Sequence, residues 1–341
     1  MSYQKKYKLR VGVIGLGVGL KHLEAFMTSK DAEVISVCDF DKFKLEKIKK
    51  AYPVIKVFKD ENLIFKDESI DIVSIASFDN YHFSQIVKAY KYNKHILIEK
   101  PLCQNPTQLK IIYELFKKNK KIFFSSNLVL RTNHFFQTIK EELKRKKYGK
   151  LFHLEADYNW GRVQKIKSGW RSKMQFYSII QGAGVHMIDL VIWLLNEKPI
   201  YVTAQENNIA TKNSDLKYSS FALLLLQFRS GLTVKICANG GCVHPHFHSV
   251  RIFGTKKTML HEYSKTLSIV NNNNKYYVSN LNPRYPDKIS RKKLIHNFVM
   301  QIKQNKRKLL IETKDIFDSM SICFAAEKSI KNRKRIKIDY L

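Results

Sequence analysis

The feature that most constrains the fold is a regular alternation of strand-like and helix-like segments in residues 1–125. Runs of this apolar, β-branched composition are typical of strands that are buried on both faces. Strands that alternate with helices predict right-handed βαβ units and a parallel sheet. We therefore expect an α/β fold that begins with a doubly wound parallel sheet of the Rossmann type. The expected strands cover 10–15, 33–39, 71–77, 94–100 and 121–127, and the helices lie around 20–30, 41–51, 80–92 and 105–119.

The pattern changes after about residue 127. Long strand-like segments follow one another without crossover helices, which predicts an α+β domain with a largely antiparallel sheet. These segments cover 150–160, 199–207, 218–228, 232–239 and 248–254, and helices are expected over 132–147, 288–305 and 313–332. We predict two domains, residues 1–126 and 127–341, because the chain is too long for one ordinary core.

The chain is strongly basic, with 61 Lys and Arg against 29 Asp and Glu and a formal net charge of +32. The excess is scattered along the whole sequence, without zinc-finger spacing, an aromatic RNA-binding motif or a helix-turn-helix. This distribution indicates a solvated, lysine-rich surface and no specific nucleic-acid partner. The alternative is that the positive field attracts anionic substrates such as nucleotide sugars.

The cysteines and the apolar runs indicate a cytoplasmic protein. Cys38, Cys103, Cys237, Cys242 and Cys323 contain no C-x-x-C pair, so neither a disulfide framework nor a zinc site is expected. The basic N-terminus and its apolar continuation imitate a signal peptide, but no small-residue cleavage site follows. No run of eighteen apolar residues is present, so we expect no association with a membrane.

A glycine-rich turn follows the first expected strand. Gly15 permits a tight turn, Gly17 lets a pyrophosphate approach the backbone, and Gly19 opens the next helix. The third glycine of the usual spacing would stand at position 20, where this chain has Leu20. Asp39 ends the next strand, where a carboxylate binds ribose hydroxyls and repels a 2′-phosphate. Because Phe40 supplies no compensating cation, the pattern predicts NAD rather than NADP as the cofactor.

An acid, a base and a proline end the strand over 94–100. Ligands of open α/β sheets bind beyond the carboxyl ends of the strands, so Glu99 and Lys100 are expected at the cofactor crevice. Pro101 lacks an N–H and cannot continue a central strand, so it ends the run there.

The ordered motifs VGVIGLGVGLKH, SFDNYH, KHILIEKPL, GWR, GVHMIDLVIWLL and AAEKS resemble the Gfo/Idh/MocA family of sugar and inositol oxidoreductases over almost the whole chain. The resemblance implies that Lys100 is the lysine of the family's E-K-P signature and that the Lys100–Pro101 peptide is cis. It also implies that His186 is the catalytic histidine and that Ser77 and Phe78 contact the cofactor through their backbone. Asp189 lies one helical turn beyond His186, where its carboxylate can orient or charge-stabilise that ring.

Three positions depart from the family pattern. Phe78 stands where the family usually has proline and Asp79 where it usually has asparagine, and the third departure bears on the chemistry. Where the family often carries an aspartate, four residues before the histidine, this chain has Gly182. Three interpretations remain open: a lysine–histidine pair is sufficient, Tyr177 helps to relay the proton, or hydride chemistry has been lost.

These observations predict an NAD-dependent dehydrogenase that acts on a CH–OH group of a sugar, sugar acid or nucleotide sugar. Histidine provides a base with a pKa near neutrality, and a neighbouring ammonium stabilises a developing alkoxide. The alternatives are a redox-neutral glycosidase-type enzyme that retains NAD and a non-catalytic NAD-binding sensor. We expect a homo-oligomer, dimer or tetramer, and no metal, because no carboxylate or cysteine pattern completes a site around the imidazoles of His244, His246 and His248. The candidate substrate residues are Asn127, Arg131, Tyr158, Trp170, Arg171 and Asp189.

Overall fold

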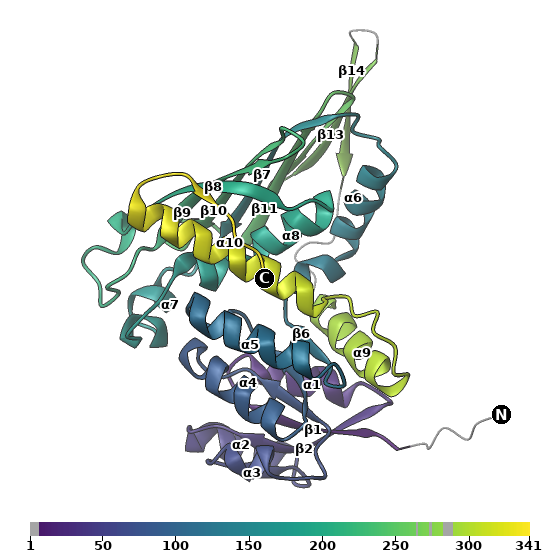
Figure 1. The fold of residues 1–341 in the computed structure, drawn as a ribbon, viewed down its shortest axis with the longest axis vertical. Helices are drawn as coiled ribbons and strands as arrows, with labels where there is room; N and C mark the ends of the chain where they lie inside the picture. The colour runs from purple at the N-terminus through teal and green to yellow at the C-terminus, as the bar shows by residue number, and fades with distance from the viewer. Residues whose placement is uncertain (1–6, 264, 273–274, 282–288) are drawn as a thin grey trace, which may run out of the picture. The chain divides into compact units, whose positions relative to one another are not determined.

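The computed structural model describes residues 7–263, 265–272, 275–281 and 289–341 (Figure 1). The chain divides into two compact units. Unit 1 contains residues 1–132 and 288–316, and unit 2 contains residues 133–287 and 317–341.

Unit 1 is built on a six-stranded sheet in which all paired strands are parallel. The order β3-β2-β1-β4-β5-β6 reverses direction beside β1, and such a switch point is where open α/β sheets bind ligands. The predicted parallel, doubly wound fold is therefore confirmed. The strands are β1 (Leu9–Ile14), β2 (Ala32–Cys38), β3 (Lys56–Phe58), β4 (Ile72–Ile75), β5 (His95–Ile98) and β6 (Phe124–Ser126).

Two helices of unit 1, α2 and α5, begin at capping side chains. The Asp41 carboxylate accepts hydrogen bonds from the N–H groups of Phe43 and Lys44, and Asn105 caps the helix that Pro106 opens. A late helix, α9 (Ser290–Lys303), contacts α1, and Lys303 Nζ lies 2.6 Å from Asp31 Oδ1. The main helices are α1 (Gly19–Met27), α2 (Lys42–Ala51), α3 (Asn62–Phe65), α4 (His82–Lys91) and α5 (Pro106–Lys118).

Unit 2 is built on a nine-stranded sheet of order β14-β13-β12-β11-β7-β10-β9-β8-β15. Every described pairing is antiparallel except that of β7 with β10, so the predicted, largely antiparallel sheet is confirmed. The strands are β7 (Leu151–Asn159), β8 (Pro199–Asn207), β9 (Phe221–Phe228), β10 (Thr233–Asn239), β11 (Phe247–Gly254), β12 (Lys257–His261), β13 (Thr266–Asn272), β14 (Lys275–Leu281) and β15 (Ile336–Lys337).

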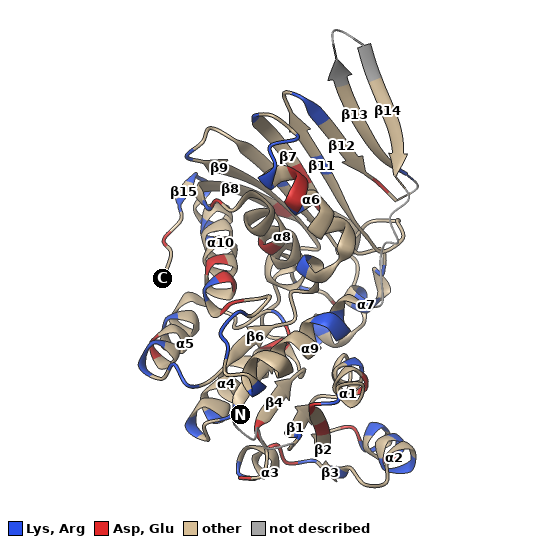
Figure 2. Cartoon of the chain, turned by 90° about the vertical axis from the view of Figure 1, so that its right-hand side faces the viewer, with Lys and Arg blue, Asp and Glu red and all other residues tan. Residues whose placement is uncertain are grey.

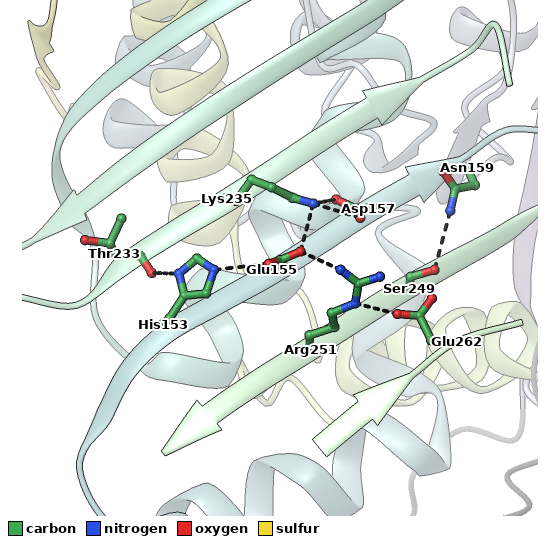
Figure 3. Close-up of polar contacts among 9 residues, drawn as sticks. All are labelled: His153, Glu155, Asp157, Asn159, Thr233, Lys235, Ser249, Arg251 and Glu262. Atoms are coloured by element: carbon green, nitrogen blue, oxygen red, sulfur yellow. Dashed lines mark hydrogen bonds and ion pairs between the residues drawn. The ribbon is translucent and has the colours of Figure 1, made fainter. Parts of the chain in front are cut away.

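The two faces of this sheet differ in chemistry because side chains alternate along a strand. On β7, Leu154, Ala156 and Tyr158 are buried, and α8 (Val185–Leu195) packs against this strand. The intervening residues of β7 belong to a network of ion pairs and hydrogen bonds on the other face (Figure 3). The remaining helical segments of unit 2 include α6 (His134–Lys144), α7 (Gln164–Lys167), the 3-10 turn η3 (Trp170–Lys173), the π-helical turn η4 (Ile180–Gly184) and α10 (Thr313–Asn332), whose first turn belongs to unit 1.

In the described part of the chain, no helix has the length and apolar character needed to cross a bilayer. The five cysteines are all free.

Candidate active site

The glycine turn of unit 1 has the geometry that dinucleotide binding requires. Gly15 has a φ of +86°, and a Cβ atom there would lie 2.5 Å from the carbonyl oxygen of Ala76. Only glycine fits this left-handed, crowded position. A Cβ atom at Gly17 would meet nothing within 4 Å, which leaves open space beside the backbone at the start of α1. An anion can therefore approach the N–H groups there.

Asp39 lies at the end of β2 and holds this turn. Its Oδ2 accepts the N–H of Leu16 at 2.6 Å, and its Oδ1 accepts the N–H of Asp41 at 2.9 Å. The ammonium group of Lys44 lies 3.4 Å from Oδ2. Phe40 supplies no cation to this carboxylate, but Lys44, in the first turn of α2, does, and the prediction of NAD from the sequence did not take Lys44 into account.

Ser77 and Phe78 follow β4, the strand on the other side of β1. The hydroxyl group of Ser77 donates to Gln85 Oε1 at 2.6 Å, and the Phe78 ring lies 5.5 Å from the ring of Phe40. The two rings therefore join the segments that follow β2 and β4, on either side of the glycine turn.

Glu99 directly follows β5, and its contacts explain why an acid stands at the end of this strand. Its carboxylate is buried and accepts hydrogen bonds from the Asn127 amide and from His22 Nε2, the latter at 3.0 Å. The other ring nitrogen of His22 lies 2.9 Å from Ser74 Oγ. Two predicted site residues, Glu99 and Asn127, thus contact each other. Sequence reasoning missed His22, whose only signal was its place in the first turn of the helix after the glycines.

Electrostatics keep the Glu99 side chain ionised. Burial by itself raises the pKa of Glu99, but the hydrogen bond from His22, followed by the charges of that ring and of Arg291, holds the pKa well below its usual range. The Lys100–Pro101 peptide that follows is cis, as the resemblance implied, and Lys100 is half-buried. Arg131 is buried and pairs with Asp315 at 2.8 Å.

In unit 2, His186 lies in the first turn of α8 and is mostly buried. Its imidazole stacks on the phenol ring of Tyr158, with ring centroids 5.7 Å apart and planes 9° apart. His248 meets the same phenol edge-on at 4.7 Å, and His246 does so at 5.3 Å. The candidate base thus belongs to an aromatic cluster formed by α8, β7 and β11.

The cluster also affects the charge of His248. Burial, and then the nearby rings of His246 and His186, lower the pKa of His248 well below its usual value. His248 is therefore neutral at neutral pH. No group of three or more His, Cys, Asp or Glu side chains in the described ranges has a metal-binding arrangement. His244, the third imidazole of the motif, contacts Tyr263 instead of Tyr158.

Tyr177 occupies the space next to Gly182. A Cβ atom at Gly182 would lie 2.6 Å from the Tyr177 hydroxyl oxygen and 3.0 Å from two of its ring carbons. This phenol therefore lies where an aspartate side chain at position 182 would begin. Asp189, one turn beyond His186, has no exposed surface and accepts a 3.5 Å hydrogen bond from Ser319 on α10.

The segment after β7 carries the remaining predicted substrate residues. The Arg171 guanidinium carbon lies 4.1 Å from the ring centroid of Trp170 and 4.9 Å from that of Trp160. Trp160 meets Tyr158 edge-on at 6.0 Å. The structure thus brings Tyr158, Trp170 and Arg171 together with His186 in unit 2, whereas Asn127 and Arg131 belong to unit 1.

Comparisons with known proteins identify the family. Residues 9–127 match the model of an oxidoreductase family with an NAD-binding Rossmann fold, and residues 136–260 match the GFO/IDH/MocA C-terminal domain. The myo-inositol 2-dehydrogenase of Thermotoga maritima is 23% identical over 347 residues, which cover 97% of this chain and 99% of that protein.

Solved structures show the same fold. The scyllo-inositol dehydrogenase of Lactobacillus casei, crystallised with NAD(H) and scyllo-inositol, superposes with a TM-score of 0.82 at 19% identity, over 97% of this chain and 99% of that one. The myo-inositol 2-dehydrogenase of Lactobacillus plantarum gives a TM-score of 0.82 at 17% identity, over 97% of this chain and 100% of that one. The chain belongs to the Gfo/Idh/MocA family of oxidoreductases, and residues 9–127 form its NAD-binding Rossmann domain.

Proposed function

We propose that the protein is an NAD-dependent dehydrogenase that transfers a hydride between nicotinamide and a CH–OH group of a sugar, sugar acid, nucleotide sugar or related polyol. The proposal is supported by two features that occur together in this chain. A glycine turn fitted to a pyrophosphate lies in unit 1, and a histidine fixed against an aromatic platform lies in unit 2. The names of the inositol dehydrogenase relatives support a polyhydroxylated substrate.

His186 is the proposed general acid and base. Oxidation of an alcohol removes a hydride from carbon and a proton from oxygen, and an imidazole accepts that proton near neutral pH. Stacking on Tyr158 restricts the ring to one plane, so its nitrogens keep a fixed direction. Because His248 is held neutral, it adds no positive charge that would oppose proton uptake by His186.

Lys100 is the proposed electrostatic partner, and its ammonium group stabilises negative charge on the reacting oxygen. NAD supplies the hydride acceptor when bound. The residues proposed to hold it are Gly15, Gly17, Gly19, Asp39, Ser77, Phe78, Glu99 and Lys100. Asp39 favours NAD through its carboxylate, although Lys44 weakens the repulsion that a 2′-phosphate would meet.

In this proposal residues 1–126 bind the cofactor, and residues 127–341 bind the substrate and form the oligomer. The proposed substrate residues are Asn127, Arg131, Tyr158, Trp170, Arg171 and Asp189. The reaction takes place in the cytoplasm, in keeping with five free cysteines.

The test is turnover of a panel of sugars, sugar acids, nucleotide sugars and inositols with NAD, with product analysis beside NADH detection. Formation of NADH together with an equal amount of ketone supports a dehydrogenase. A cleaved product without net NADH indicates the redox-neutral reaction instead. Tight NAD binding without any turned-over compound points to a sensor.

The proposed homo-oligomer, dimer or tetramer, uses the sheet face that carries the ion-pair network (Figure 3). Lys235 lies 2.9 Å from both Glu155 and Asp157, and it pairs across the strands with Leu225. Leu223 and Leu225 of β9 are exposed on this face. Light scattering should give the mass of a dimer or tetramer for the wild type and a lower mass for Leu223→Lys/Leu225→Lys. A monomeric wild type would contradict the proposal.

A further inference from the structure

Arg171 has a rigidly held guanidinium group. The guanidinium carbon lies over the indole of Trp170 at 4.1 Å and over that of Trp160 at 4.9 Å. Contacts of this kind between a guanidinium and an aromatic face stabilise its position. The turn that carries Arg171 is itself fixed, because Ser172 donates from its N–H and from its hydroxyl group to the carbonyl oxygen of Gly169, at 3.1 and 2.8 Å.

No described residue accepts a hydrogen bond from the N–H groups of this guanidinium. Within the described ranges the Arg171 side chain takes part in no ion pair or hydrogen bond, and its Nε is buried without a partner. The two indoles beside the group carry no acceptor for its N–H donors. A buried donor without an acceptor costs free energy, and a planar fork of such donors matches a carboxylate or phosphate.

Arg171 is connected to the proposed acid/base through successive ring contacts in unit 2. Trp160 contacts Tyr158 at 6.0 Å, and Tyr158 stacks on His186 at 5.7 Å. Arg171 and His186 therefore belong to one connected set of side chains in unit 2.

The charged side chains of the segment around Arg171 are all positive. Residues 158–188 contain no Asp or Glu, and the part around α7 and η3 carries several cations (Figure 2). In the described chain, none of these cations takes part in an ion pair, so their field is not neutralised locally and attracts anions. They are Arg162, Lys165, Lys167, Arg171 and Lys173.

We infer that the substrate of the proposed reaction carries an anionic group, a carboxylate or a phosphate, and that Arg171, held beside Trp160 and Trp170, binds this group. The inference rests on the proposed function for the identity of the reacting hydroxyl, but not for the anion site itself. It selects sugar acids, sugar phosphates and nucleotide sugars over neutral sugars and inositols. A neutral ligand would leave the guanidinium fork without a charged acceptor.

The test is calorimetric binding to the NADH-loaded protein, which does not depend on turnover. Four ligands share one ring: glucose is neutral, glucuronate carries a carboxylate, glucose 1-phosphate a phosphate and UDP-glucose a diphosphate. We expect at least one anionic ligand to bind about tenfold or more tightly than glucose, and the identity of that ligand distinguishes a carboxylate from a phosphate source.

Substitutions of Arg171 test whether this residue causes the difference in ligand affinity. Arg171→Met keeps the length of the side chain and removes the guanidinium N–H donors. It should lower the affinity for the anionic ligand about 10- to 100-fold and leave the affinity for glucose within about twofold of wild type. Arg171→Lys keeps the charge without the fork and should lose most of the same affinity. Arg229→Met removes an exposed arginine from the turn between β9 and β10 and is the matched control.

The inference is overturned if every anionic ligand binds no more tightly than glucose, or if Arg171→Met and Arg229→Met have the same effect. Should Arg171→Met fail to fold by circular dichroism, Arg171→Lys carries the comparison. Selective binding of an anionic sugar without turnover would contradict the dehydrogenase proposal but not this inference. Turnover confined to neutral polyols would contradict this inference alone.

Discussion

The imidazole of His186 and the phenol of Tyr158 lie 5.7 Å apart, centroid to centroid, with their planes within 9° of parallel. The histidine comes from α8 and the tyrosine from β7, so the stack fixes the candidate base against the sheet. Tyr158→Phe keeps this platform and should retain kcat within about threefold. Tyr158→Ala removes it, and because catalytic geometry is sensitive to small displacements we expect kcat to fall about 10- to 100-fold.

Steady-state kinetics on any accepted substrate, with thermal melts as a folding control, check this prediction. Equal kcat values for Tyr158→Ala and wild type would show that the stack does not position His186.

The buried carboxylate of Glu99 should be a stability determinant of unit 1. Glu99→Ala leaves His22 and Asn127 without their acceptor inside the core, so we expect a loss of about 2–4 kcal/mol in the free energy of unfolding. The exposed Glu46 has no such partners, and Glu46→Ala is the control. Denaturant unfolding followed by circular dichroism gives both values, and similar losses in the two variants would refute the role of this network.

The burial of Glu327 should make the free energy of unfolding depend on pH in an unusual way. Glu327 lies on α10 and accepts a 2.8 Å hydrogen bond from Gln181, in the π-helical turn before α8. Burial raises the pKa of Glu327 from its ordinary 4.5 to about 7. The folded state thus binds a proton more tightly than the unfolded state, so the stabilisation is complete below about pH 4.5 and is lost as pH rises to about 7.

Glu327→Gln removes this titration. The variant should match the wild type near pH 4.5 and exceed its free energy of unfolding by about 3 kcal/mol above pH 7. Glu46→Gln, on an exposed side chain, should show no such divergence. Denaturant unfolding between about pH 5 and pH 8 measures the difference, and parallel curves for Glu327→Gln and wild type would contradict the raised pKa.

Gly182 should tolerate no side chain while Tyr177 is present. Because a Cβ atom would lie 2.6 Å from the Tyr177 hydroxyl oxygen, Gly182→Ala should cost about 1–3 kcal/mol in stability through overpacking. In a Tyr177→Ala background the same substitution should cost less. A double-mutant cycle measures this coupling, and additive effects would show that the phenol does not fill the position.

The parts of the fold that the sequence predicted are those with local causes. Asn105 and Pro106 start α5 as expected, because capping depends on neighbouring residues alone. β3 (Lys56–Phe58) and α3 (Asn62–Phe65) are too short to show a hydrophobic period, and neither was predicted. The contact of α9 with α1 joins segments more than 250 residues apart, and no local pattern indicates it.

The same difference between local and long-range causes applies to the candidate site. Gly15 and Asp39 could be predicted because each belongs to a short motif at a strand end, whereas the cis peptide before Pro101 was implied by the family resemblance. The bond between His22 and Glu99 joins α1 to β5 and needed the folded structure. His248 was considered only as a metal ligand, whereas the fold places it against Tyr158.

The most direct test of the account compares wild type, Lys100→Ala and His186→Ala on one accepted substrate, with NAD affinity measured separately. Loss of a general acid/base or of an electrostatic partner should lower kcat/KM about 100-fold or more, while the affinity for NAD changes only a few-fold in His186→Ala. NADH formation at wild-type rates in both variants would contradict the proposed roles of these two residues.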